Sequence, residues 1–154
     1  MAKGYTEPDP RYDLSGMDVA RKALILARLL GYREELRPSS VESLVPQWAR
    51  TLELEEFLER LAELDAPWKQ RVEAAKSAGA VLRYVALVTP EKIEVGVQSV
   101  PGASPLASIK GSDNQLVFTT ARYKDNPLVI TGPGAGAEVT AAGVLNDILR
   151  LAGA

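Results

Sequence analysis

The chain has 154 residues, of which 46% are hydrophobic and 25% charged, values that suit a single globular domain with a real core. A net charge of -2 argues against nucleic acid as a partner, and no apolar run is long enough to predict a membrane span. The absence of cysteine and histidine excludes disulfides, thiol nucleophiles, Ser-His-Asp triads and the usual zinc sites. A metal could bind only through oxygen ligands, and we predict no metal site. Any acid–base chemistry is assigned to Asp, Glu, Lys, Tyr or water.

The N-terminal region predicts an ordered loop followed by a helix. Pro8 and Pro10 keep residues 1–15 from forming a continuous helix. Ser15 is placed to cap a helix over 16–31, in which apolar residues recur at helical spacing. Because Ile25 and Leu29 make a second face apolar, we expect this helix to be buried on more than one side.

The rest of the chain places helices first and most strands later, which favours an α+β fold with helices packed on a mixed β-sheet. No internal repeat is found. The predicted elements are a short strand over 41–45, helices over 54–65 and 67–79, strands over 81–88, 93–100, 115–123 and 128–131, a glycine loop over 132–136 and a helix over 138–151.

Two interpretations fit Asp18 and Lys22, which are four residues apart and so share one face of the first helix. In one, the carboxylate holds a lysine that exchanges a proton with a substrate hydroxyl, while Glu7 and Asp9 on the stiff loop receive a substrate amine. In the other, Ser15 and Asp18 form a capping box and Asp18 forms an ordinary helical ion pair with Lys22. Spacing alone leaves both open.

The glycine loop also has two interpretations. Residues 132–137 match G-x-G-x-x-A between a strand and a helix, the order of a dinucleotide-binding turn. No further strand or acidic residue follows at the distance that such a site needs, so a Rossmann fold is not predicted here. What remains is either a backbone surface for a cofactor edge or phosphate, or a close-packed turn.

Five blocks of sequence together resemble the homoserine dehydrogenase family. They occur in the family's order and span nearly the whole chain, although each block alone is a weak signal. Tyr12 stands where the family commonly has an aspartate. The blocks are Gly4-Tyr-Thr-Glu-Pro-Asp-Pro10 with Asp13-Leu-Ser-Gly-Met-Asp-Val-Ala-Arg-Lys22, Val81-Leu-Arg-Tyr84, Lys110-Gly-Ser-Asp-Asn114, Gly132-Pro-Gly-Ala-Gly136 and Val139-Thr-Ala-Ala-Gly143.

This resemblance implies NADP- or NAD-dependent interconversion of aspartate semialdehyde and homoserine, an oxidoreductase step of threonine and methionine biosynthesis. It implies that Glu7 binds the substrate's amino group, that Asp18 holds homoserine and orients Lys22, and that Lys22 donates the proton to the aldehyde oxygen. Asp13 is implied as a further pocket carboxylate. In the glycine loop, Gly136, with Gly134 beside it, is implied to contact the nicotinamide cofactor.

The resemblance also implies how the chain is organised. Residues 1–133 correspond to the substrate-binding, catalytic and homodimerising region, and 134–154 to a loop and helix that complete a nucleotide-binding domain. The N-terminal Rossmann domain of the family, which provides most of the cofactor site, has no counterpart in these residues. We therefore expect Leu145, Ile148 and Leu149 to be partly uncovered.

We also expect this chain, as part of a longer parent that is either monofunctional or fused to an aspartokinase, to lack dehydrogenase activity alone. The alternative function is a non-catalytic module that binds homoserine or dimerises. The expected location is the cytoplasm, or a plastid if the source is a plant or alga.

Overall fold

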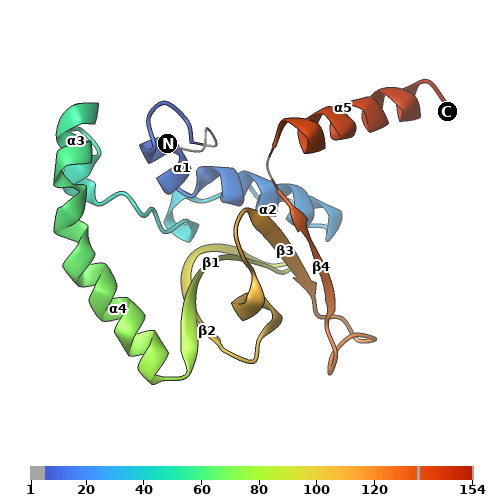
Figure 1. Cartoon of the computed structure of the whole chain (residues 1–154). Helices are drawn as coiled ribbons and strands as arrows, with labels where there is room; N and C mark the ends of the chain where they lie inside the picture. Colours follow the sequence, from blue (N-terminus) through green and yellow to red (C-terminus); the bar gives the residue numbers. More distant parts are fainter. Residues whose placement is uncertain (1–5, 135, 154) are drawn as a thin grey trace. The chain divides into compact units, whose positions relative to one another are not determined.

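A computed structural model describes residues 6–134 and 136–153, in two compact units over residues 1–101 and 102–154 (Figure 1). Gly4 and Tyr5 of the first sequence block, and Ala135 of the glycine loop, lie outside the described residues. The helices and strands are α1 (Arg11–Leu14), α2 (Met17–Leu29), α3 (Leu54–Arg60), α4 (Asp65–Ser77), β1 (Ala80–Val88), β2 (Ile93–Pro101), β3 (Asp113–Phe118), β4 (Leu128–Pro133) and α5 (Ala137–Leu151).

The first unit is built on an antiparallel hairpin of β1 and β2, with Val88 opposite Ile93 at the turn. Helix α2 packs on this hairpin (Figure 1). Its contact face is made of small residues three and four positions apart, Ala20, Ala23 and Ala27, all of which are buried. Their small size lets the helix backbone approach Ile93 and Val95 of β2 closely.

Only one face of α2 is buried, so the expectation of burial on several sides is wrong. Ile25 is 65% exposed and Leu29 is 80% exposed. Hydrophobicity at these positions could not tell a second packed face from an uncovered one, because the answer depends on which elements pack around the helix.

A second small core lies under α3. Phe57 is 1% exposed and packs with Val45 and Ala49. A 3-10 turn over Leu61–Leu64 leads directly into α4, which begins at Asp65 rather than at Pro67. Pro67 is tolerated because it still lies in the first turn, where backbone N–H groups have no partner within the helix.

The predicted strand over 41–45 is reduced to a single parallel bridge between Val41 and Val95. The 3-10 turn Pro38–Ser40 precedes it, so only a short extended stretch remains. This bridge still holds the 38–45 segment against β2, because the backbone N–H of Glu42 donates to the carbonyl of Val95 at 2.8 Å.

The second unit contains the antiparallel pair β3–β4 and helix α5. Strand β3 ends at Phe118 instead of Tyr123, and the N–H of Tyr123 donates to Thr120 Oγ1 in a local turn. No described residue of this unit is buried. The α+β class is confirmed, and the strands described here form two antiparallel pairs instead of one mixed sheet.

Candidate functional site

The predicted substrate residues Glu7, Asp13, Asp18 and Lys22 all lie on one continuous segment, formed by the proline loop, α1 and the first turns of α2. The loop is stiffened by Pro8 and Pro10, and Pro10 is buried. All four side chains belong to exposed residues. The segment therefore presents its charged groups on the surface of the first unit.

Glu7 and Asp13 are joined within this segment. The backbone N–H of Glu7 donates to Asp13 Oδ2 at 3.0 Å. One carboxylate oxygen of Asp13 is thus used to hold the loop, and the Glu7 side chain is left at the surface. The predicted pocket carboxylate at position 13 has a structural task whether or not it also contacts substrate.

Asp18 and Lys22 form the ion pair that their spacing predicts, with Asp18 Oδ2 at 2.8 Å from Lys22 Nζ. The capping-box interpretation is wrong, because the backbone N–H of Ser15 donates to the carbonyl of Tyr12 and the helix is capped by Gly16. Ser15 Oγ does accept the N–H of Met17 at 3.2 Å. Asp18 is thus free of a capping role and holds Lys22.

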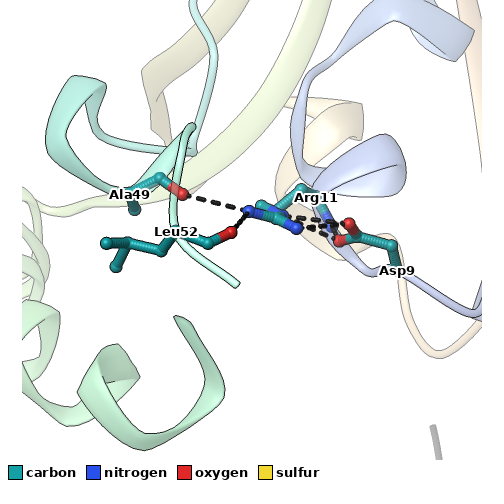
Figure 2. A network of polar contacts seen from close by, with 4 residues as sticks. All are labelled: Asp9, Arg11, Ala49 and Leu52. Carbon is teal, nitrogen blue, oxygen red and sulfur yellow. Dashed lines mark hydrogen bonds and ion pairs between the residues drawn. The ribbon is translucent and has the colours of Figure 1, made fainter. Parts of the chain in front are cut away.

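Asp9, which the sequence paired with Glu7 as a second carboxylate for a substrate amine, is instead held by Arg11 (Figure 2). Arg11 Nη2 lies 2.7 Å from Asp9 Oδ2, and Nη1 donates to the carbonyl of Leu52 at 2.6 Å. Hydrogen bonding from the Arg11 side chain lowers the pKa of the Asp9 carboxyl. Both carboxylate oxygens of Asp9 thus already accept hydrogen bonds from Arg11.

The start of α2 is supported by contacts that the sequence did not reveal. Gly16 has φ +77°, and a Cβ there would lie 1.8 Å from the hydroxyl oxygen of Tyr84 on β1. That hydroxyl donates to the backbone carbonyl of Glu42 at 2.6 Å. Burial and the nearby Glu42 carboxylate raise the pKa of Tyr84. The helix that carries Asp18 and Lys22 therefore begins in contact with the Tyr84 side chain, which its hydrogen bond to Glu42 holds in place.

Glu42 extends this support into β2. Its Oε2 accepts the backbone N–H of Val97 at 2.8 Å, and its Oε1 lies 3.4 Å from Arg71 Nη1. A Cβ on Gly96 would lie 2.7 Å from Glu42 Oε2, so the side chain uses the space that glycine leaves. A glycine inside a strand is the one sequence signal that could have indicated this close approach.

The two glycines predicted to contact a cofactor differ in their surroundings. A Cβ on Gly134 would lie 1.9 Å from Asn114 Nδ2, so close packing already explains a glycine there. Gly136 has φ +133° and precedes α5, with no described atom within 4 Å of where its Cβ would be. Contact of Gly136 with a nicotinamide cofactor stays a prediction.

Two open cavities adjoin the first unit's core. One, of about 310 Å³, is lined by Arg11, Ser15, Met17 and Arg50 among others. The other, of about 330 Å³, is lined by residues of 39–42 and 94–98. Glu7, Asp18 and Lys22 line neither. The charged groups predicted to bind substrate therefore lie on the open surface of this unit.

Within the described residues there is no cluster of three or more acidic side chains arranged to hold a metal ion. No described helix is both long and apolar enough to cross a membrane.

These features define an α+β domain with a carboxylate–lysine pair at a helix start and a glycine turn before a last helix. The sequence profile of the homoserine dehydrogenase family matches residues 1–149, and the chain belongs to that family. The resemblance inferred from the five blocks is confirmed.

Two curated relatives illustrate the contexts in which this domain occurs. A chloroplastic bifunctional aspartokinase/homoserine dehydrogenase of Zea mays is 50% identical over 96% of this chain, which covers 16% of that protein. A homoserine dehydrogenase of Emericella nidulans is 46% identical over 96% of this chain, which covers 42% of it. The chain thus spans about a sixth of the first relative's length and about two fifths of the second's.

Solved structures agree with the fold. A Candida auris protein of unknown function matches with a TM-score of 0.88 and 49% identity, covering 97% of this chain and 42% of that one. A putative homoserine dehydrogenase of Archaeoglobus fulgidus matches with a TM-score of 0.67 and 30% identity, covering 97% and 40%.

Proposed function

We propose that this chain is the substrate-binding and catalytic part of a homoserine dehydrogenase, which interconverts aspartate semialdehyde and homoserine with NADP or NAD. The observation that carries the proposal is the Asp18–Lys22 pair, with Nζ and Oδ2 2.8 Å apart, at the glycine-capped start of α2. Family membership over residues 1–149 gives this pair its chemical context.

The roles follow from charge and position. Glu7 accepts the ammonium group of the substrate and so sets the direction of the rest of the molecule. Lys22, held by Asp18, stabilises the negative charge that grows on the aldehyde oxygen during reduction and gives it a proton. Asp13 contributes a further carboxylate beside Glu7. The cofactor, when bound, supplies the hydride, and Gly136, with Gly134 beside it, would form part of its site.

The proposal covers organisation as well. Residues 1–133 form the substrate and homodimer region, and 134–154 complete a nucleotide-binding domain whose remainder is supplied by other residues of a longer parent. Leu145, Ile148 and Leu149 of α5 are 55%, 56% and 43% exposed, in support of a missing partner surface. Dimerisation is supported by one face of β3–β4, where Phe118, Leu128 and Ile130 are exposed.

The proposed location is the cytoplasm or a plastid. The name of the Zea mays relative places that protein in the chloroplast, which supports the second of these.

A second candidate function is a homoserine-binding module without catalysis. The exposed Glu7 and the Asp18–Lys22 pair would serve homoserine binding without any catalytic step, which supports this candidate. On either proposal the isolated chain reduces no NADP with homoserine. Homoserine binding is common to both.

Calorimetric titration with homoserine tests the shared step. Glu7→Ala removes the ammonium partner and Lys22→Ala removes the hydroxyl partner, so we expect each to weaken binding roughly tenfold or more, the loss typical of a charged hydrogen bond. Glu91→Ala and Lys69→Ala remove exposed side chains of the same types away from the segment and should bind as the parent does. Equal affinity in all five proteins would count against the proposed substrate site.

A further inference from the structure

The guanidinium of Arg11 has its polar groups turned to the protein. Nε lies 3.0 Å from both oxygens of Asp9, and Nη2 lies 2.7 Å from Oδ2. Nη1 donates to the carbonyls of Leu52 at 2.6 Å and Ala49 at 3.3 Å (Figure 2). The Asp9 and Arg11 side chains are only 25% and 20% exposed. Arg11 therefore fastens the proline loop to the 49–52 segment.

The same segment rests on the second core. Ala49 is fully buried and packs with Phe57, and the Arg11 guanidinium carbon lies 5.4 Å from the Phe57 ring centre. The point to which Arg11 attaches the loop is therefore a packed part of the unit. A planar five-donor fork is needed to reach one carboxylate and two carbonyls together, which a lysine ammonium cannot do in the same geometry.

Glu7 sits immediately beyond this attachment. Pro8 separates it from Asp9, and a proline leaves few backbone conformations between the two residues. On the other side of Arg11, Asp13 returns to accept the Glu7 N–H at 3.0 Å. Arg11 thus lies within the loop that the hydrogen bond between Glu7 and Asp13 closes. Movement of Arg11 would loosen both the Asp9 contact and this hydrogen bond, which together hold the Glu7 backbone.

We propose that Arg11 is a positioning residue that sets the place of Glu7, and through it the recognition of the substrate ammonium group. Arg11 itself does not contact substrate, because its donors are engaged by Asp9 and by the 49–52 carbonyls. This inference rests on the proposed role of Glu7. It adds that amine recognition depends on a second ion pair, Asp9–Arg11, which is only partly exposed.

The first test compares two ligands that differ only in the amine. Homoserine and 4-hydroxybutanoate are titrated calorimetrically into the parent chain and into Arg11→Lys. We expect Arg11→Lys to lower homoserine affinity roughly tenfold, equivalent to about 1.4 kcal/mol, and to leave 4-hydroxybutanoate affinity nearly unchanged. A general loss of structure would weaken both ligands together. Arg33→Lys, the same change at an exposed position, should alter neither affinity.

The second test needs no ligand. Solvent exchange of the Glu7 amide, measured by NMR, should become several-fold faster in Arg11→Lys, because the Asp13 hydrogen bond is held less often. Asp9→Asn should act in the same direction, which provides a second variant if Arg11→Lys folds poorly. Arg33→Lys should exchange at the parent rate.

The outcomes distinguish the positioning role of Arg11 from the proposed function of the chain. Unchanged Glu7 exchange in both loop variants, or an equal loss of affinity for both ligands, would overturn the positioning role of Arg11. Faster Glu7 exchange together with a parent chain that does not prefer homoserine would support the hold of Arg11 on the loop and count against the proposed function.

Discussion

At the scale of single residues, the Asp9–Arg11 pair gives the fold a pH dependence. Hydrogen bonds from the Arg11 side chain and then from its backbone N–H lower the pKa of Asp9 below its ordinary value of 3.8. Because the folded pKa lies below the unfolded one, the stabilisation is fully present above the unfolded pKa and is lost as the pH falls through the folded pKa.

We therefore expect Asp9→Asn to unfold at lower urea than the parent at pH 7, with the difference shrinking below about pH 4 as Asp9 becomes protonated in the parent. Circular dichroism followed during urea titrations between pH 7 and pH 3 measures it. Asp125→Asn, at an exposed loop position, should match the parent throughout. A difference that stays constant across this pH range would show that the carboxyl does not titrate as proposed.

The sequence predicted the contact between Asp18 and Lys22 but not the one between Asp9 and Arg11, and the reason is physical. Asp18 and Lys22 could be paired in advance because helical periodicity brings positions four apart together, and the 2.8 Å contact bears this out. The role of Asp9 was missed because the contacts of Arg11 with Asp9 and Leu52 join residues that share no helix or strand. No period links such residues, and only the folded chain shows which carbonyls lie within reach.

At the scale of elements, the contact of α2 with β1 predicts how Gly16 tolerates change. An alanine there needs a left-handed backbone, which costs about 1–2 kcal/mol, and also meets the Tyr84 hydroxyl. Gly31, just after the same helix, has φ +93° with open space around its missing Cβ. Gly31→Ala therefore measures the backbone strain without a steric contact.

Urea unfolding should give Gly31→Ala a loss of about 1–2 kcal/mol and Gly16→Ala a loss larger by at least about 1 kcal/mol. The excess measures the contact between the start of α2 and Tyr84. Equal losses for the two variants would mean that Tyr84 moves aside at little cost and does not fix the helix start.

Elements were predicted well where local signals were complete. The β1–β2 hairpin was placed to within a residue because alternating apolar residues flank a clear turn. The 41–45 strand and the end of β3 were wrong, because both segments have strand-like residues without a partner to complete a ladder. Pairing between distant segments decides such cases, and periodicity within one segment does not report it.

At the scale of the whole molecule, the division at residue 101 was not predicted, since it follows from long-range contacts. The predicted boundary between residues 133 and 134 separates functional regions and not compact units, and it stays a prediction. The two units also differ in packing. Buried residues among those described all belong to the first unit, so burial predicts that its amides resist exchange more strongly.

The two antiparallel hairpins allow this to be tested within one sample, because β1–β2 and β3–β4 have the same type of hydrogen-bonded ladder. Ile93, Val95 and Val100 of β2 are buried, whereas no described residue of β3 or β4 is. Native-state amide exchange by NMR should show β1–β2 amides opening only with global unfolding. Amides of β3–β4 and α5 should exchange faster by on the order of 100-fold or more through local opening. Equal protection in the two hairpins would contradict the inference that the first unit carries the stability of the chain.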